Sequence, residues 1–221
     1  MTFSLVGKCN RTGMFGAAVT TSSIGVGCRV PWARAGVGAI CTQHRTDPRL
    51  GPRGLDLLEA GKSASETVAE LTANDPTIGW RQLAVIDKNG GTACFHGDRI
   101  GSIHAGAEGD CCCATGNIIR NEQIPAAMVA AFEASAADPL AERLILALEA
   151  GGEAGGEFRL LKSAAVLVVD EYSFPLVDLR VEFDRAPLTE LRYLWEIYRP
   201  QVQDYVRRTM DPDSIPYPEY E

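Results

Sequence analysis

The first seven residues, Met1-Thr2-Phe3-Ser4-Leu5-Val6-Gly7, alternate in bulk as a β-strand does. A second apolar run, Phe15-Gly16-Ala17-Ala18-Val19-Thr20-Thr21, follows after the turn Asn10-Arg11-Thr12-Gly13. Side chains of a strand alternate between two faces, so the pattern predicts strands over residues 2–9 and 14–22.

Thr2 has two interpretations. As a β-branched residue it suits a strand. If Met1 were removed, Thr2 would carry both a hydroxyl and a free α-amine, and an α-amine titrates at about 7.7–8.0 in model compounds. Such an amine can act as the base for the hydroxyl beside it, which is the chemistry of N-terminal-nucleophile (Ntn) amide hydrolases. With Met1 retained, the Thr2 nitrogen is an amide and is no base.

Composition narrows the class of protein. The chain has 221 residues, of which 46% are hydrophobic and 23% charged. These values predict one globular domain, residues 1–210, with a proline-rich tail over 211–221. A net charge of −8 disfavours nonspecific nucleic-acid binding. No apolar stretch approaches the roughly 20 residues of a membrane span. We see no leader at the start, and we expect a cytoplasmic protein without membrane contact.

The seven cysteines do not form a metal-binding pattern. Cys111, Cys112 and Cys113 are consecutive, so their side chains would alternate between the faces of a strand rather than converge on one metal. No CxxC pair occurs, and the three histidines lack zinc-ligand spacing. An odd count without a leader also argues against a disulfide framework. We expect small apolar side chains, no metal and no cofactor.

Strands come first, then helices, then strands again. Asn89-Gly90 predicts a hairpin between strands at 82–87 and 92–96, and Ser63 with Glu66 predicts a capping box inside a helical stretch over 52–74. Further strands are predicted at 36–43, near 110–114, 163–169 and 176–183, and further helices at 122–134, 140–150 and from 187. This order favours antiparallel sheets with separate helical layers over a βαβ alternation. An α+β fold of the four-layer α/β/β/α sandwich type accommodates these elements, although other α+β arrangements do too.

Several segments resemble one bacterial family, the uncharacterised domain of unknown function (family 1028). They are Thr2–Val6, Gly16–Val19, Val30–Ala39 with its Pro-Trp-Ala-Arg-Ala-Gly run, Gly51–Leu58, Gln82–Val85, Gly116-Asn117, Leu140–Leu144 and Ser163–Ala165. The resemblance implies an Ntn-hydrolase-like α/β/β/α fold and no established substrate or reaction. The chain departs from the family pattern at Thr21-Ser22, at Lys162, and at Asp47-Pro48. If these positions line a pocket, its ligand differs from that of typical members.

Three residues are candidates for catalysis. Thr2 is the candidate nucleophile. Ser22 ends the second predicted strand, where its hydroxyl could orient a nucleophile or be attacked itself, or could serve only the turn. Asn117 precedes a predicted helix and would act either as its N-cap or as an oxyanion-hole donor. His44 is a further candidate for a general base.

Four residues are candidates for substrate binding. Ser23 shares the position and the turn alternative of Ser22. Arg34 would clamp a carboxylate through two parallel hydrogen bonds, or would be a solvated surface residue. Gln43 offers donors and acceptors at the end of a strand. Lys162 would supply a cation at the start of a buried strand, or would extend into solvent.

Three functions are compatible with these residues. The first is an Ntn-type hydrolase acting on an amide or related C–N bond of an unknown small molecule. The second is a non-catalytic small-molecule-binding or scaffold protein on the same fold, since fold does not oblige catalysis. The third is an enzyme whose internal nucleophile is Ser22, Ser23 or Cys28. We also expect a homodimer, the commonest assembly of soluble proteins.

Overall fold

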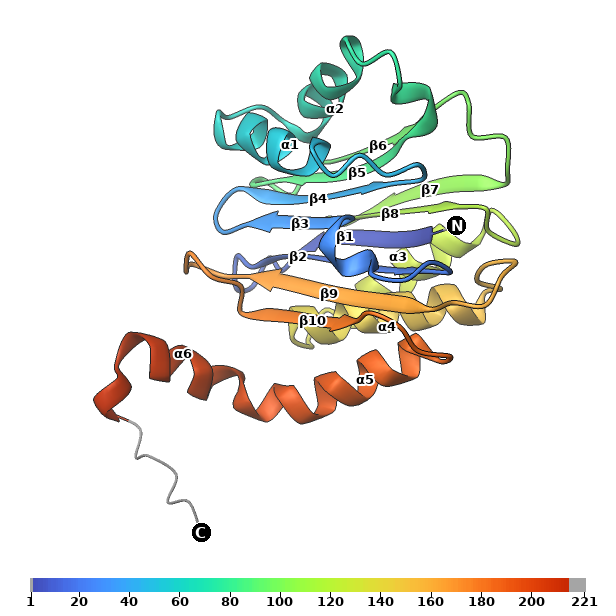
Figure 1. Cartoon of the computed structure of the whole chain (residues 1–221). Coiled ribbons are helices and arrows are strands. Elements are labelled where there is room, and N and C mark those ends of the chain that lie inside the picture. Colours follow the sequence, from blue (N-terminus) through green and yellow to red (C-terminus); the bar gives the residue numbers. More distant parts are fainter. Residues whose placement is uncertain (1, 215–221) are drawn as a thin grey trace.

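Two antiparallel β-sheets lie face to face in the computed structural model, which describes residues 2–214 (Figure 1). The larger sheet holds, in spatial order, β10 (Val177–Val181), β9 (Ser163–Val169), β2 (Phe15–Thr21), β1 (Thr2–Lys8), β8 (Cys112–Asn117) and β7 (His104–Gly109). The smaller sheet holds β3 (Pro31–Arg34), β4 (Gly38–Gln43), β5 (Gln82–Asp87) and β6 (Thr92–His96).

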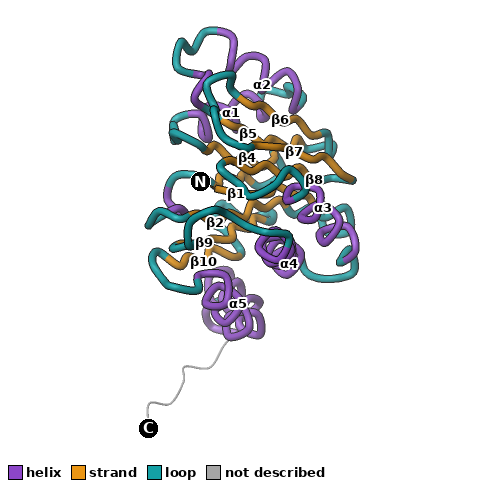
Figure 2. Tube along the Cα trace, turned by 90° about the vertical axis from the view of Figure 1, so that its right-hand side faces the viewer, coloured by secondary structure: helices purple, strands orange, loops and turns teal. Residues whose placement is uncertain are grey.

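Helices cover the outer faces of both sheets (Figure 2). Helices α1 (Leu50–Glu59) and α2 (Ala64–Ala73) pack on the smaller sheet. The larger sheet is covered by α3 (Ile124–Ala134) and α4 (Leu140–Glu153), and α5 (Pro187–Tyr198) packs against α4 and the β9–β10 edge. Helix α6 (Val202–Met210) follows α5. The chain is therefore a mixed α+β protein.

Alternation along β1 directs Thr2 towards the facing sheet. Phe3 and Leu5 are fully buried in the core formed with α3 and α4. Ser4 points the other way, and its hydroxyl donates to Gln43 of β4 across the sheet interface at 2.8 Å. Because successive side chains of a strand point to opposite faces, Thr2 shares the inter-sheet face with Ser4. Thr2, the first residue of the central strand β1, thus lies at one end of that interface.

The strongest local signals of the sequence are confirmed. The hairpin joins β5 to β6 antiparallel across residues 88–91. Ser63 and Glu66 form the reciprocal capping box at the start of α2, and the apolar run of residues 163–169 is strand β9.

Several expected boundaries differ from the structure. The helical stretch predicted over 52–74, in one or two pieces, consists of two helices, with α2 starting at the predicted capping box. Strands β3 and β7 were not expected. The Gly151-Gly152 pair lies inside α4, although the helix was expected to stop at residue 150. A Cβ atom at Gly151 would approach Phe3 and Met128 to about 3 Å, so only glycine fits there without a shift of its neighbours. Gly151 therefore allows α4 to pack closely on the larger sheet and does not end the helix.

The structure describes only part of the C-terminal region. Helix α6 and residues 211–214 are included, whereas residues 215–221 of the expected tail, like Met1, lie outside the described residues. Among residues 2–214, no helix combines the length and the apolarity needed to cross a bilayer.

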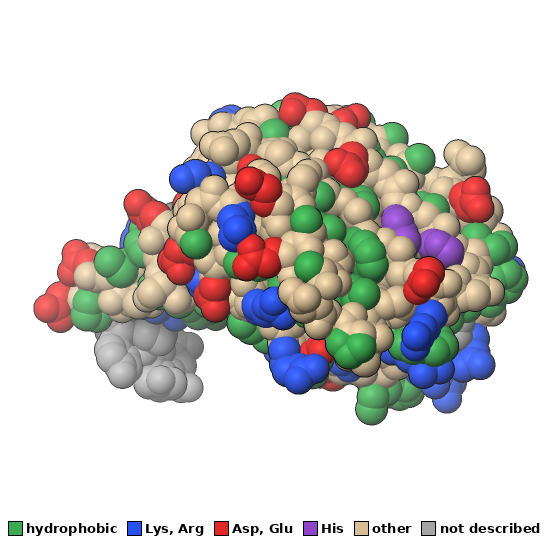
Figure 3. Space-filling view, turned by 90° about the horizontal axis from the view of Figure 1, so that it is seen from above, with side chains coloured by type: hydrophobic (Ala, Val, Ile, Leu, Met, Phe, Trp, Pro, Cys, Tyr) green, Lys and Arg blue, Asp and Glu red, His purple; other side chains and the backbone are tan. Residues whose placement is uncertain are grey.

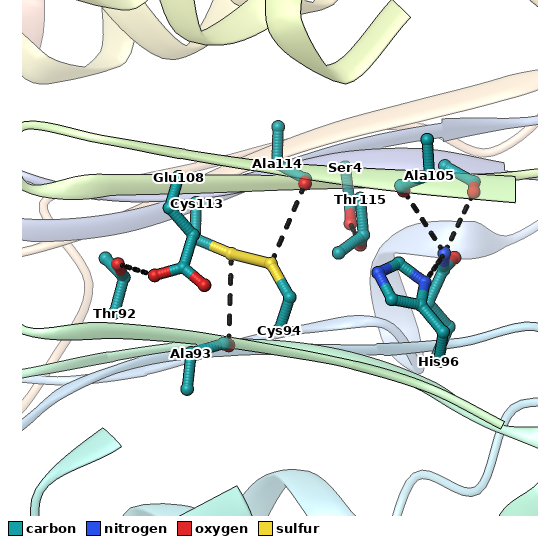
Figure 4. Close-up of a disulfide and its surroundings, with 12 residues drawn as sticks. Ser4, Thr92, Ala93, Cys94, His96, Ala105, Glu108, Cys113, Ala114 and Thr115 are labelled. Atoms are coloured by element: carbon teal, nitrogen blue, oxygen red, sulfur yellow. Dashed lines mark hydrogen bonds between the residues drawn. A yellow bond between two sulfur atoms is a disulfide. The ribbon is translucent and has the colours of Figure 1, made fainter. Parts of the chain in front are cut away.

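A disulfide joins the two sheets, contrary to the expectation that all cysteines are free. Cys94 of β6 is bonded to Cys113 of β8 (Figure 4). The other five cysteines are free. An odd total does not prevent two of the cysteines from pairing, and the facing sheets bring Cys94 and Cys113 together.

The disulfide can be tested by counting the free cysteine thiols. In protein purified and unfolded without reductant, we expect iodoacetamide to label five cysteines, and to label all seven after reduction. The bond closes a loop with a sequence separation of 19, so its removal is expected to cost about 3 kcal/mol of unfolding free energy. Intact-mass spectrometry provides the count, and seven labels without reductant would contradict the pairing.

Candidate functional site

Thr2 is held between two neighbouring strands. In the larger sheet it pairs with Thr21 of β2 on one side and with Asn117 of β8 on the other. The hydroxyl oxygens of Thr2 and Thr21 lie 3.1 Å apart. Only 7% of Thr2 is exposed, and that part faces a cleft. The strand pairing therefore fixes Thr2 at the wall of an accessible cavity.

The Thr2 cleft has a volume of about 660 Å³. Besides Thr2, Thr21 and Ile118, its walls are formed by residues from three loops, 23–30, 44–46 and 99–102, and by Trp80. This volume is typical of small-molecule sites. Three arginines contribute to the walls, and within residues 2–214 no aspartate or glutamate does.

Backbone strain is concentrated at this cleft. Three non-glycine residues of the described chain have positive φ, and two of them, His44 at 57° and Ile118 at 54°, line the cleft. For a β-branched residue such as Ile118 this conformation is a genuine outlier. Strained backbone of this kind clusters at functional sites, where the surrounding structure enforces it. The strain supports the assignment of the cleft as the candidate site.

His44 is suited to accept a proton. Its Nδ1 lies 2.7 Å from the carbonyl oxygen of Trp80, which can only accept, so Nδ1 carries the hydrogen. Burial lowers the pKa of His44 below its ordinary value. The ring is therefore neutral at pH 7, with an unprotonated Nε2.

Gln43 connects the two sheets and does not face the cleft. It is fully buried, accepts from Ser4 at 2.8 Å, and donates to Gln82 of β5 at 2.6 Å and to Thr115 Oγ1 of β8 at 3.1 Å. Its donor and acceptor groups are thus used inside the protein. Gln43, predicted to bind substrate, does not line the cleft.

Asn117 is the last residue of β8 and not a helix N-cap, since α3 begins seven residues later at Ile124. Its side chain is fully buried, and its Nδ2 donates to Gln82 Oε1 at 3.0 Å. Its Oδ1 has no hydrogen-bond partner among the described residues. Asn117 lies beside Thr2 in the sheet, and its amide is turned to the inter-sheet network.

The other predicted site residues divide into two groups. Ser23 lines the cleft, where its hydroxyl accepts from Arg29 at 2.7 Å. Arg34 instead binds Asp56 and Glu59 of α1 at 2.9 and 2.7 Å and lies outside the cleft. The third member, Lys162, also lies outside the cleft, with an exposed side chain. The Lys162 backbone amide donates to the carbonyl of Thr21.

Glu157 is a buried acid that the sequence did not reveal. It is 5% exposed and forms an isolated bridge with Ile119, just beyond the end of β8. Burial raises the pKa of its carboxyl to about 7, and neighbouring Ser22 offsets part of that rise. No hydrogen bond of ordinary geometry reaches either carboxylate oxygen from residues 2–214. The residue follows a Gly-Gly pair, which carries no signal of such a role.

The raised pKa of Glu157 predicts a pH-dependent stability. The folded state binds this proton more tightly than the unfolded state, so the stabilisation is complete below about pH 4.5 and is lost as pH rises to about 7. In the form of the protein that retains Met1, Glu157→Gln should increase the unfolding free energy by up to about 3 kcal/mol relative to the unsubstituted chain between pH 4.5 and pH 8. Urea unfolding across this range measures it. Exposed Glu153→Gln is the control, and parallel pH curves for wild type and Glu157→Gln would oppose the assignment.

The fold and the cleft define a mixed α+β protein with a candidate site at the start of its first, central strand. The chain belongs to the family of unknown function DUF1028, whose model matches residues 2–191. A crystal structure assigned to that family, from Silicibacter pomeroyi, is similar at 30% identity, with a TM-score of 0.86 over 94% of this chain and 90% of that one. The family resemblance seen in the sequence is thereby confirmed.

A second solved structure is more distant. Anbu (ancestral beta-subunit) from Yersinia bercovieri is 12% identical, with a TM-score of 0.37 over 99% of this chain and 100% of that one. A likeness of this degree supports no structural conclusion. No curated protein matches this chain.

Proposed function

We propose that the protein is an Ntn-type hydrolase that cleaves an amide or related C–N bond of a small molecule. The position of the Thr2 side chain, at the wall of a cleft and at the start of the central strand, carries the proposal. The proposal includes an α/β/β/α sandwich of the Ntn-hydrolase type, in line with helices on the outer faces of two stacked sheets. It requires removal of Met1.

The reaction would proceed in two steps. Thr2 Oγ1 attacks the carbonyl carbon of the substrate while its proton passes to the α-amine of the same residue. Collapse of the tetrahedral intermediate breaks the C–N bond, and the proton leaves with the departing amine. Water then hydrolyses the resulting ester, releasing the acid and restoring the hydroxyl. The Thr21 hydroxyl, 3.1 Å from Thr2 Oγ1, is placed to orient the nucleophile in both steps.

Glu157 would act as a positioning residue in this scheme. The Glu157 carboxyl is buried near Ser22. Ser22 directly follows β2, the strand whose Thr21 pairs with Thr2. A buried carboxylate is unfavourable unless a cation approaches it. Removal of Met1 creates a new ammonium group on Thr2 at this end of the sheet. We assign Glu157 as the group that orients the Thr2 amine and stabilises its positive charge once it has accepted the proton of the hydroxyl.

The experiment compares two forms of the protein on a panel of small primary amides and N-acyl compounds. One form begins at Thr2, and the other retains Met1 because of a preceding extension. Amine or ammonia release is expected from the first form alone, since only it has a free α-amine next to the hydroxyl. Equal turnover by both forms would contradict the proposal. Ligand binding by both forms without turnover of any compound would favour the alternative, a small-molecule-binding protein on the same fold.

A further inference from the structure

Three arginines line the Thr2 cleft of a protein that is acidic as a whole. The whole chain has a net charge of −8, yet Arg29, Arg45 and Arg99 all line this cleft and no carboxylate of the described residues does. Figure 3 shows a group of Lys and Arg side chains at the end of the molecule where the chain begins in Figure 1. The cleft is therefore locally positive in an acidic protein.

Several arginines outside the cleft, although not all of them, form salt bridges with carboxylates. Arg34, Arg49, Arg180 and Arg192 each lie 2.5 to 2.9 Å from an aspartate or glutamate oxygen. Within residues 2–214, none of the three cleft arginines has a carboxylate within 4.0 Å. None of the three is therefore held in a salt bridge by an acid of the described residues.

Arg29 is held in place before any ligand arrives. Its guanidinium donates to Ser23 Oγ at 2.7 Å, to the carbonyl of Ile24 at 2.9 Å, and to the carbonyl of Gly25. These acceptors belong to the loop that forms one wall of the cleft, and all three are neutral. The loop thus fixes the orientation of the group and leaves its positive charge intact, which reduces the entropy lost on binding an anion.

Trp80 organises another wall of the cleft. The Arg45 guanidinium lies 3.8 Å from the centroid of the Trp80 ring, and that of Arg99 lies 5.9 Å from it. A guanidinium stacked on an indole keeps its in-plane N–H donors available for a second partner. Planar N–H pairs match the geometry of a carboxylate or phosphate. Both walls therefore present donors suited to an oxyanion.

We propose that the Thr2 cleft binds a small molecule bearing a carboxylate or phosphate group, held by Arg29, Arg45 and Arg99. Resting on the proposed function, the inference extends to the substrate class: an anionic amide whose charged group occupies the arginine-lined part of the cleft while its C–N bond lies at Thr2. Arg34, which the sequence suggested for this role, is neutralised on α1, and the three cleft arginines take its place.

Calorimetric titration of Thr2→Ala protein tests the inference separately from catalysis. Succinate, inorganic phosphate and the neutral analogue succinamide are the probes, and succinate against phosphate distinguishes the two kinds of anion. We expect succinate or phosphate to bind and succinamide not to bind. Arg45→Gln and Arg29→Gln, each added to Thr2→Ala, should lower the affinity for the anion by about tenfold or more, which corresponds to about 1.4 kcal/mol.

Arg53→Gln is the matched control, because Arg53 is exposed on α1 and lies outside the cleft. The Thr2→Ala protein that also carries Arg53→Gln should bind the anion with the same affinity as Thr2→Ala alone. Thermal melting verifies that each variant is folded. Equal binding of succinamide and succinate, or equal weakening by Arg53→Gln, would overturn the inference. Anion binding without any hydrolytic activity would overturn only the proposed function, whereas hydrolysis of neutral amides in preference to anionic ones would overturn only this inference.

Discussion

Turnover by the Thr2→Ala variant is expected to fall at least about 10³-fold below that of the wild type. The substitution removes the hydroxyl that forms the covalent ester, and loss of a nucleophile leaves only the catalysis provided by binding and charge stabilisation. Ligand affinity should change little, because Thr2 is 7% exposed and forms a small part of the cleft wall. Steady-state kinetics would show the loss in kcat rather than in KM.

Two further variants make this result specific. Thr2→Ser keeps a hydroxyl and an α-amine, so it should retain substantial activity. Thr72→Ala removes a hydroxyl on α2, which packs on the outer face of the smaller sheet, and should behave as wild type. Unchanged turnover in Thr2→Ala would transfer the nucleophile to an internal residue, with Ser22, Ser23 and Cys28 as the remaining candidates.

Gln82→Leu is expected to destabilise the fold by about 3–5 kcal/mol, because it removes the centre of the buried inter-sheet network. The Gln82 carbonyl accepts from Gln43 at 2.6 Å and from Asn117 at 3.0 Å. Its amide donates to His96 Nδ1 at 2.8 Å and to the carbonyl of Gly116 at 2.9 Å. Leucine fills a similar volume and leaves several of these polar groups buried without a partner.

Urea unfolding measures the loss, and Gln203→Leu is the control, since Gln203 is exposed on α6. That control should change stability by less than about 0.5 kcal/mol. Because Asn117 pairs with Thr2 in the sheet, Gln82→Leu should also lower kcat under conditions where the variant is still folded. A loss of stability equal to that of Gln203→Leu would show that the network is not required.

Local signals explain which parts of the fold were predictable. The Asn-Gly turn, the Ser63 capping box and the apolar run of 163–169 each act within a few residues, so they specify their element without tertiary information. Strand β7 was not expected because its sequence, His104-Ala105-Gly106-Ala107-Glu108-Gly109, has few residues that favour strands. Pairing with β8 overrides this weak propensity.

The candidate site was predictable only where one residue carries the chemistry. Thr2 can be singled out in the sequence because its hydroxyl would lie beside a free α-amine once Met1 is removed, although a β-branched residue also suits a strand. Arg34 and Arg45 are indistinguishable as sequence, and only the fold shows that one faces the carboxylates of α1 and the other faces Trp80 of the cleft. Glu157 was missed for the same reason, since its burial depends on β8 and on the end of β2 and not on its neighbours in the sequence.

One measurement addresses the central claim, that Thr2 becomes the first residue and acts as the nucleophile. Protein purified from its native host is quenched with acid during turnover of an active substrate and digested, and its peptides are mapped by mass spectrometry. The proposal predicts an N-terminal peptide that begins at Thr2 and carries the acyl group of the substrate. Fully active protein that retains Met1, or an acyl group found on Ser22, Ser23 or Cys28, would contradict it.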